Sequence, residues 1–287
     1  MQAGNAWILK PVAEMSTSEF SDWCQLLETR SGMVLTEQRR SFLQVNLTAR
    51  MRELGVTDYA DYYQQVLEGP SAAVEWTNLL DKLTVQETHF FRHQASYDFV
   101  ADFLRKRIAD KNHKKPLSIW SVGCATGEEA WSLAITVAQV VREQDSGQGF
   151  AVTATDISHS ALKKARAACY SARRLEPLSK ELIERYFVEE QPGFFQVKKN
   201  LMQRVCFARL NVLELANAPI SSMDVIFCQN LLIYFRRWQR REILNHLAAK
   251  LAPGGVLVVG LGEVTGWEHP DLQPVDNEKV LAFTRKG

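Results

Sequence analysis

The residues that most clearly suggest chemistry lie where an apolar run gives way to glycines and then to acids, in Leu117–Glu129. An apolar strand that turns tightly into a helix is typical of a site for a nucleotide-like ligand. Gly123 and Gly127 fit such a turn, because a Cβ at either position would keep a ligand away from the backbone. Both glycines are therefore predicted cofactor-binding residues.

A second acidic position, Asp156, follows the apolar strand expected at 150–155. A carboxylate at the end of the second strand is where Rossmann dehydrogenases and class I methyltransferases both hydrogen-bond ribose hydroxyls. The turn reads Gly-x-Ala-x-Gly, and Glu128 and Glu129 follow it. They would repel a pyrophosphate but suit a cationic sulfonium ligand. These acids could also simply favour the helix dipole, but that does not explain the glycines before them.

A polar pair, Gln229 and Asn230, follows the buried strand expected at 224–228, and an aromatic residue comes soon after it. This arrangement fits a pocket for a methyl acceptor. Asn230 could equally cap the next helix. The segment alone leaves both interpretations open.

These positions need a scaffold, and the second part of the chain predicts one. Apolar strands alternate with amphipathic helices, which predicts a mostly parallel sheet with helices on both faces. The fold class is therefore α/β, a doubly wound sheet of the class I methyltransferase kind, closed by a strand pair within 272–285. A small antiparallel β-subdomain is expected as an insertion at about 170–204. The strands are expected at 119–122, 150–155, 205–210, 224–228 and 256–260, with helices at 128–142, 158–168 and 237–251.

The first part of the chain predicts only helices. Ser16 and Glu19 form a capping box at the start of the first, Gly55 ends the second, and Gly69-Pro70 ends the third. The predicted organisation is an N-terminal helical domain at 1–84, a linker and connecting helix at 85–115, and a cofactor-binding domain at 116–287.

Composition excludes several classes of function. A net charge of +1 over 287 residues argues against general attraction to nucleic acid or to an anionic membrane. No apolar run approaches the roughly 20 residues of a membrane helix. The five cysteines are dispersed, which indicates reduced thiols in a cytoplasm. His89 and His93 have a spacing that can hold a metal on a helix, but no third ligand lies nearby, so no metal is assigned.

The motifs together resemble the CheR-type chemotaxis receptor methyltransferases over nearly the whole chain. Glu-Thr-x-Phe-Phe-Arg at 87–92, Thr-Gly-Glu-Glu at 126–129 and Asn-x-x-Ile-Tyr-Phe at 230–235 carry the resemblance. It implies methyl esterification of glutamate side chains on the cytoplasmic helical bundle of a chemoreceptor, with S-adenosyl-L-methionine as the donor and S-adenosyl-L-homocysteine as the product. By position it also implies these cofactor contacts: Gln86, Thr88, Arg92, Glu129, Asp156, Asn211, Val212, Gln229 and Asn230.

The same resemblance places Arg92 and Tyr234 nearest the transferable methyl, as the catalytic pair. Arg92 could hold the acceptor carboxylate, and Tyr234 could donate a hydrogen bond or present its π face to the sulfonium. An acceptor glutamate is already ionised at neutral pH, so no general base is expected. Arg92 could instead form a salt bridge between the two domains.

Partners follow from the resemblance and from charge. Arg39 and Arg50 project in nearly the same direction from the helix expected at 37–54, where an acidic receptor helix could dock. The β-subdomain could bind a receptor C-terminal tail peptide. Departures from the family pattern, such as Gln229 where arginine is common, leave open a PilK-like paralogue of a type IV pilus array. The sequence is also compatible with a non-catalytic scaffold that binds the cofactor or its product, and with a methyltransferase for another substrate.

Overall fold

The computed structural model describes residues 12, 14–110 and 113–287. The chain divides into two compact units, Met1–Val85 and Gln86–Gly287, and each is described by itself. The division lies at the early end of the interval in which the sequence places a boundary. The predicted connecting helix, α5 (Gln94–Ala109), packs against α6 (Glu128–Glu143) within the second unit.

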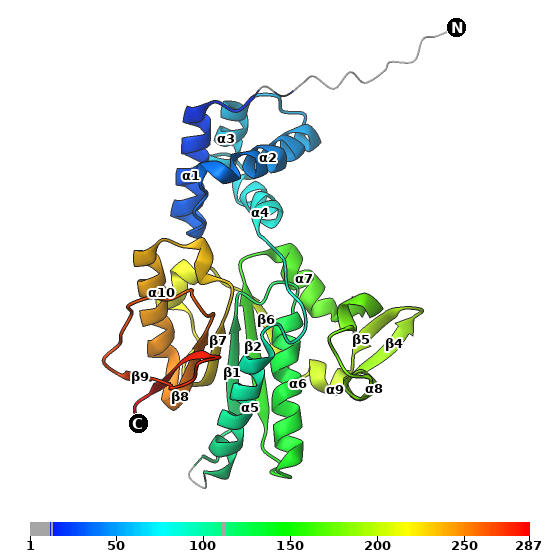
Figure 1. Cartoon of the computed structure of the whole chain (residues 1–287). Helices are drawn as coiled ribbons and strands as arrows, with labels where there is room; N and C mark the ends of the chain where they lie inside the picture. Colours follow the sequence, from blue (N-terminus) through cyan, green and yellow to red (C-terminus); the bar gives the residue numbers. More distant parts are fainter. Residues whose placement is uncertain (1–11, 13, 111–112) are drawn as a thin grey trace. The chain divides into compact units, whose positions relative to one another are not determined.

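Helices build the described part of the first unit (Figure 1). Its α-helices are α1 (Thr17–Ser31), α2 (Arg40–Leu54), α3 (Tyr59–Leu67) and α4 (Ala72–Leu83). The capping box that the sequence predicts is present, because Ser16 and the N3 residue Glu19 bond each other's backbone N–H groups. Thr36, which immediately precedes the helix expected at 37–54, makes no side-chain cap hydrogen bond. A short 3-10 helix, η1 (Glu37–Arg39), follows it, so α2 begins later than predicted.

The core of this unit consists of aromatic and leucine side chains. Trp23 is almost fully buried, and its ring centroid lies 5.4 Å from that of Tyr62 and 5.0 Å from that of Tyr63. Leu43 and Leu47 on α2 are completely buried, one turn apart. The apolar spacing that predicts the helix is thus also the spacing that fills the core.

The second unit is built on a seven-stranded sheet with strand order β6-β2-β1-β7-β8-β10-β9. Its first five strands in this order are parallel, and β10 pairs antiparallel with β8 and with β9. This confirms the predicted fold class and the closing strand pair. The strands are β1 (Leu117–Val122), β2 (Phe150–Asp156), β6 (Val205–Arg209), β7 (Met223–Cys228), β8 (Leu251–Val259), β9 (Leu272–Pro274) and β10 (Leu281–Arg285).

Alternate residues of the central strands enter two separate cores. Val225 and Phe227 of β7 join the core that contains residues of α5 and α6, whereas Ile226 and Cys228 join the core that contains residues of α10 (Arg237–Lys250). The sheet is therefore covered on both faces. Since β1 lies between β2 and β7, the chain reverses its direction of winding at β1, and the carboxyl ends of β1 and β7 form the switch point (Figure 1).

Two local features need comment. The Pro253-Gly254-Gly255 sequence, which follows the helix expected at 237–251, lies inside β8, where the register against β7 shifts. The predicted insertion is a three-stranded antiparallel sheet of order β3-β5-β4, with a short helix, α8 (Lys180–Tyr186), between β3 and β4. Its strands are β3 (Cys169–Ser171), β4 (Phe187–Gln191) and β5 (Phe194–Val197).

The remaining helical segments of the second unit are short. They are α7 (His159–Ala167), α9 (Lys199–Met202), and the 3-10 helices η2 (Ala172–Leu175), η3 (Val212–Asn217) and η4 (Leu232–Tyr234). Among the residues that the structure describes, no helix has the length and apolar character needed to cross a membrane.

Candidate functional site

The turn after β1 is fixed to the end of β2 by backbone hydrogen bonds. The N–H groups of Gly123 and Cys124 both donate to the carbonyl of Thr155, at 2.8 and 2.9 Å. The next N–H, of Ala125, donates to Asp156 Oδ2 at 2.9 Å. The glycine turn and the acid, which the sequence predicts as separate parts of one site, therefore lie together at the carboxyl edge of the sheet.

Both positions of the turn favour glycine, but the predicted reason was incomplete. Gly123 and Gly127 have φ of 79° and 98°, in the region that favours glycine. A Cβ on Gly127 would lie 2.8 Å from the Cβ of Ala165 and 2.9 Å from the hydroxyl of Tyr170. A Cβ on Gly123 would lie 3.1 Å from Leu231. Packing within the protein and a positive φ therefore require glycine at 127, and at 123 the positive φ favours glycine, before any ligand is considered.

Asp156 is held in one orientation. Its Oδ1 accepts from the N–H of Ser158 at 2.8 Å, while Oδ2 accepts from Ala125. Ser158 in turn caps α7 by accepting from the N–H of Ala161 at 3.1 Å. The carboxylate thus joins the glycine turn to the start of α7. Its predicted contact with ribose hydroxyls stays a prediction.

The two glutamates that begin α6 have different surroundings. Glu128 is buried, with its Oε2 accepting from the hydroxyl of Thr126 at 2.6 Å and its Oε1 lying 3.4 Å from Arg174 Nη1. The Oε1 of Glu129 accepts from the hydroxyl of Ser121 at 2.6 Å, and Glu129 forms no ion pair with a described residue. Glu128 therefore has a structural role, and Glu129 is the acid available to a ligand.

The surroundings of the half-buried Glu129 raise the pKa of its carboxyl group. Desolvation, with the negative charges of Glu263 and Asp156, raises its pKa to about 8, against the opposing effects of the Ser121 hydrogen bond and of Arg92. A cation bound beside Glu129 would stabilise the ionised form of its carboxyl group. This donor set fits S-adenosylmethionine, which carries positive charges on its sulfur and amino groups.

The turn after β7 carries the predicted acceptor pair. The amide of Gln229 is buried and donates to Ser96 Oγ at 2.8 Å and to the carbonyl of Val259 at 3.4 Å, so in this structure it bonds to protein groups. Asn230 has φ of 58° and precedes η4, whose last residue is the half-buried Tyr234. Arg236, not Asn230, is the N-cap of the next α-helix, so the alternative that Asn230 caps that helix is wrong.

The segment that precedes α5 is fixed to this domain at several points. Gln86 Nε2 donates to Ser160 Oγ at 3.1 Å and to Ser158 Oγ at 3.3 Å. Phe90 is buried, with edge-to-face contacts to Tyr170 and Phe187 of the β-subdomain. These contacts position the whole Glu-Thr-x-Phe-Phe-Arg motif along the second unit.

The charged members of this segment have the following positions. Arg92 is half-buried, and its Nη1 donates to the carbonyl of Glu87 at 3.1 Å. His89 and His93 do not share a helix, because α5 begins only at Gln94 and His93 has φ of 64°. The i, i+4 helical geometry that could bring their rings to one metal is therefore not present.

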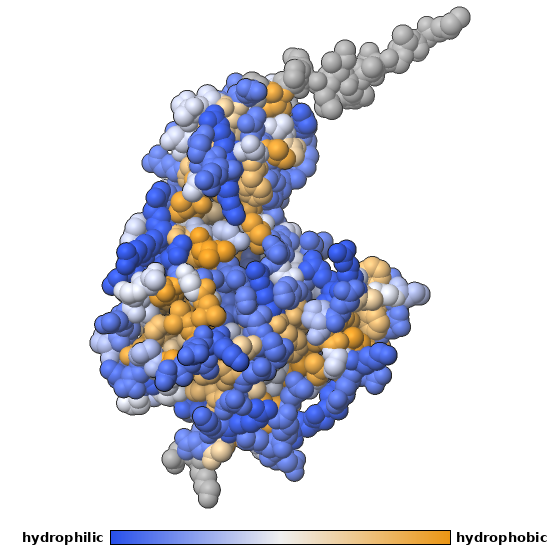
Figure 2. Space-filling view, viewed as in Figure 1, coloured by the Kyte–Doolittle hydropathy of each residue, from blue (hydrophilic) through white to orange (hydrophobic). Residues whose placement is uncertain are grey.

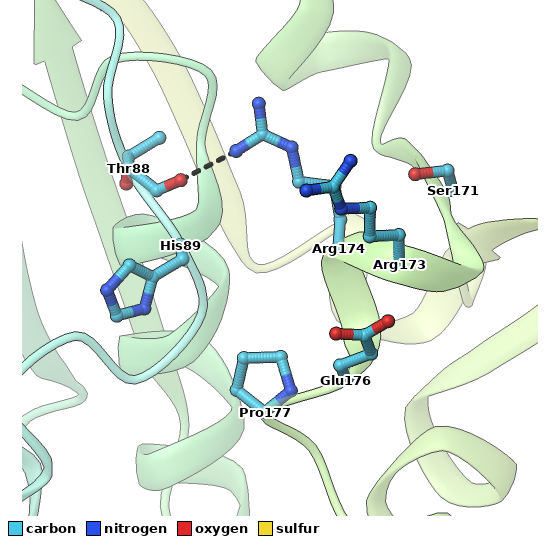
Figure 3. A pocket seen from close by; sticks show the side chains of 7 residues that line it. All are labelled: Thr88, His89, Ser171, Arg173, Arg174, Glu176 and Pro177. Atoms are coloured by element: carbon cyan, nitrogen blue, oxygen red, sulfur yellow. Dashed lines mark hydrogen bonds between the residues drawn. The ribbon is translucent and has the colours of Figure 1, made fainter.

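A pocket of about 630 Å³ opens between this segment and the β-subdomain (Figure 3). Across it, Arg174 Nη1 donates to the carbonyl of Thr88 at 2.7 Å. Arg174 therefore links η2 to the predicted cofactor segment and to Glu128. The pocket is lined by Thr88, His89, Ser171, Arg173, Arg174, Glu176 and Pro177.

The remaining predicted cofactor contacts lie at the end of β6. The N–H of Leu210 donates to the carbonyl of Asp156 at 3.0 Å, which places the start of η3 beside the end of β2. There Asn211 Oδ1 accepts from the N–H of Leu213 at 3.1 Å, and Val212 is half-buried. The structure thus brings the ends of β1, β2, β6 and β7 to one edge of one sheet.

The predicted docking arginines of the helical unit differ from each other. Arg50 donates from Nε and Nη2 to the two oxygens of Glu75, at 2.8 and 2.6 Å, and from Nη1 to Glu53 at 2.7 Å. Its guanidinium is already bound to carboxylates of its own unit, so the structure gives Arg50 a structural role. Arg39 is exposed, and its docking role stays a prediction.

Three residues near the site were missed by sequence analysis. Ser121 and Arg174 each bond one glutamate of α6, and Glu263 accepts from the backbone of the turn after β7. Only Glu263 could have been identified from the sequence, because it is an acid that follows soon after the carboxyl end of an apolar strand. The other two depend on tertiary contacts that no local pattern encodes.

Comparison with known proteins gives the family. Residues 18–84 match the CheR methyltransferase all-alpha domain, and residues 86–280 match the CheR methyltransferase SAM binding domain. The chain is 32% identical over 252 residues to the chemotaxis protein methyltransferase of Escherichia coli K12, covering 87% of this chain and 85% of that protein. It is 31% identical to chemotaxis protein methyltransferase 1 of Vibrio cholerae, covering 87% and 90%.

With Pseudomonas aeruginosa chemotaxis protein methyltransferase 1 the identity is 29%, covering 86% of this chain and 90% of that protein. Both matched domains occur in the expected order, and together they extend over most of the sequence. The glycine turn, Asp156 and Glu129 all lie within the matched SAM binding domain. The chain therefore belongs to the CheR methyltransferase family, whose members are S-adenosylmethionine-dependent protein-glutamate methyltransferases.

Proposed function

We propose that this enzyme esterifies glutamate side chains on the cytoplasmic helical bundle of a chemoreceptor, in the cytoplasm and within a chemotaxis array. The observation that carries the proposal is Glu129, a carboxylate without an ion pair among the described residues, beside the glycine turn of a CheR-family chain. The names of the similar proteins favour chemotaxis over type IV pilus adaptation.

The chemistry requires positioning more than proton transfer. S-adenosylmethionine supplies, when bound, an electrophilic methyl group on a sulfonium sulfur. A glutamate acceptor has an ordinary pKa of about 4.3 and is already a nucleophile at neutral pH. The protein has to remove water from the acceptor oxygen and align it, and such positioning can contribute about 7–11 kcal/mol.

The residues divide this work between them. In the proposal, Glu129 and Asp156 bind the cationic and ribose parts of the donor. Gln86, Thr88, Asn211, Val212, Gln229 and Asn230 complete the cofactor contacts. Arg92 holds the acceptor carboxylate through its guanidinium, for which its half-buried position leaves access. Tyr234, half-buried on the turn after β7, orients the reacting groups.

The β-subdomain supports a second contact with the receptor. Strand β4 lies at the edge of the three-stranded sheet, so its outer backbone groups are open to another strand. Val188 and Phe194 are 43% and 48% exposed, and Figure 2 shows apolar surface in this region. We therefore propose that an extended receptor tail adds to β4. A receptor fragment without its tail should bind more weakly than the full cytoplasmic domain, with an unchanged kcat.

The decisive experiment is mass spectrometry of a receptor cytoplasmic fragment after incubation with the enzyme and isotope-labelled S-adenosylmethionine. The proposal predicts methyl groups on glutamates that are released as methanol at alkaline pH. No transfer in a single turnover, despite binding of the donor, would indicate a scaffold. A methyl product stable to base would indicate a different acceptor.

A further inference from the structure

We propose that Glu263 is a positioning residue for methyl transfer, and that its carboxylate holds the Asn230–Tyr234 turn in the conformation that the reaction needs. The proposal rests on the proposed function in so far as this turn faces the acceptor. Glu263 itself is a positioning and not a catalytic residue, because the structure gives it contacts to backbone groups of the turn.

The contact is specific and buried. Glu263 is only 3% exposed, and its Oε2 accepts from the N–H of Leu232 at 3.2 Å, although the two residues are 31 positions apart in the sequence. Burial raises the pKa of Glu263, and the backbone groups of Leu232, Asn230 and Leu231 oppose this rise, so the carboxylate lies beside all three residues of the turn. One distant side chain thus binds a backbone N–H group of the turn.

The rest of the local structure makes room for this side chain. A Cβ on Gly260 would lie 2.5 Å from Glu263 Oε1, so any larger residue at 260 would displace the carboxylate from this position. That Oε1 is buried and has no hydrogen-bond partner among the described residues. Leaving a buried carboxylate oxygen unsatisfied is unfavourable. Because the unsatisfied oxygen lowers stability, we infer that Glu263 has another role, which is to fix the conformation of the turn.

The turn needs to be held. Asn230 has φ of 58°, which is uncommon for a residue other than glycine. On the carbonyl side of the same segment, Arg240 donates from Nε to the carbonyl of Phe235 at 2.9 Å, and from Nη1 to the carbonyl of Glu263 at 3.1 Å. Glu263 thus binds an N–H group within the turn, and Arg240 binds both the carbonyl of the residue that follows the turn and the backbone of Glu263.

The position of Glu263 connects it to the cofactor site. Its charge is close enough to Glu129 to contribute to the raised pKa of that residue. The turn that it holds carries Asn230, a predicted cofactor contact, and Tyr234, a predicted catalytic residue. A displacement of this turn would therefore change both cofactor affinity and the rate of transfer.

The test compares two variants that separate position from charge. Glu263→Gln keeps an oxygen that can accept from the backbone N–H group of Leu232, whereas Glu263→Asp keeps the charge but withdraws it by one methylene. We expect E263D to lower kcat by about 10- to 100-fold, since a misplacement near 1 Å can have that effect. We expect the affinity for S-adenosylhomocysteine to fall at least about fivefold in E263D, and both quantities to stay within about threefold of wild type in E263Q.

Asp224 provides a matched control. It is also 3% exposed and accepts from a backbone N–H, that of Ser118 at 2.9 Å, but at the amino end of β7. Asp224→Glu should lower the melting temperature without changing kcat or product affinity. Equal losses of kcat in the Asp224 and Glu263 variants at equal loss of stability would overturn the proposal, as would wild-type behaviour of E263D. Product affinity is measured without receptor, so it still tests Glu263 if wild-type enzyme methylates no receptor.

Discussion

Glu75 in the helical unit is buried and Glu129 in the second unit is half-buried, and these two glutamates have opposite environments. In the helical unit, burial would raise the pKa of Glu75, but hydrogen bonds from Arg50 and from the hydroxyl of Tyr62 outweigh it, so that the pKa is lowered. In the methyltransferase unit, the Ser121 hydroxyl is the one hydrogen-bond donor to Glu129 among the described residues, and desolvation raises the pKa of Glu129 to about 8. Glu75, with its bidentate arginine, is a structural element, whereas Glu129, which has no ion pair among the described residues and lies beside the glycine turn, is the acid available to a bound cation.

The largest expected effect tests the structural role of the pair formed by Glu75 and Arg50. Arg50→Ala leaves the buried carboxylate of Glu75 without its partner, which should lower the free energy of unfolding by about 3–5 kcal/mol. Arg52→Ala, on the same helix but exposed, should change it by less than about 0.5 kcal/mol. Denaturant unfolding measures both. An R50A protein as stable as R52A would contradict the structural role of Arg50.

The next effect concerns the glycine turn beside Glu129. Gly127→Ala places a Cβ 2.8 Å from Ala165 at a φ of 98°, and should cost about 1–3 kcal/mol or more in stability. Gly193 has φ of 76° but nothing within 4 Å of an added Cβ. Gly193→Ala should therefore show only the backbone strain, about 1 kcal/mol. Equal melting temperatures for the two variants would show that packing does not determine Gly127.

The pH dependence of stability tests the environment of Glu129. The pKa of Glu129 is raised from 4.5 to about 8 on folding, so between these values the unfolded chain has lost a proton that the folded chain keeps. The contribution of this group to the free energy of unfolding is therefore complete below about pH 4.5 and declines as the pH rises towards 8. Glu129→Gln should remove this decline, and thermal unfolding between pH 5 and 9 should show a flatter profile. An unchanged slope would mean that Glu129 is ionised in the folded protein.

The smallest expected effect is on receptor docking. Arg39 is exposed on the helical unit, and reversal of one exposed charge weakens association modestly. Arg39→Glu should raise the KM for receptor by about two- to fivefold at low salt, without changing the affinity for S-adenosylhomocysteine. Arg52→Glu is the charge-matched control. If both variants had the same effect, the docking surface would not be centred on Arg39.

The parts of the structure that could be predicted are those encoded locally. Alternating strands and helices, the capping box at Ser16 and the glycines of the first turn depend on neighbours in the sequence, and the structure contains them. The hydropathy pattern was also sufficient to indicate that the sheet is covered on both faces. Helix ends were less accurate, as at Thr36, because a 3-10 turn satisfies the same apolar spacing.

What could not be predicted depends on contacts across the fold. The pairing of Arg50 with Glu75 joins residues 25 positions apart, and no helical wheel of α2 alone contains it. The same is true of Glu263, which reaches the turn after β7 from 31 residues away. The sequence correctly predicts that Arg50 lies on a helix, and it suggests that Arg50 contacts an acidic receptor helix. In the tertiary structure, Arg50 is instead paired with Glu75 and Glu53 of its own unit.

The central claim is that Glu129 is held ready for a positively charged donor, and calorimetric titration tests it most directly. Wild-type protein and E129Q would each be titrated with S-adenosylhomocysteine and S-adenosylmethionine, with E75Q as a buried-acid control. We predict binding to wild type and E75Q, an about 10- to 100-fold loss of affinity in E129Q, and release of a proton to the buffer on binding near pH 7 in wild type and E75Q but not in E129Q. Equal affinities in wild type and E129Q, or no binding to folded wild-type protein, would contradict the account.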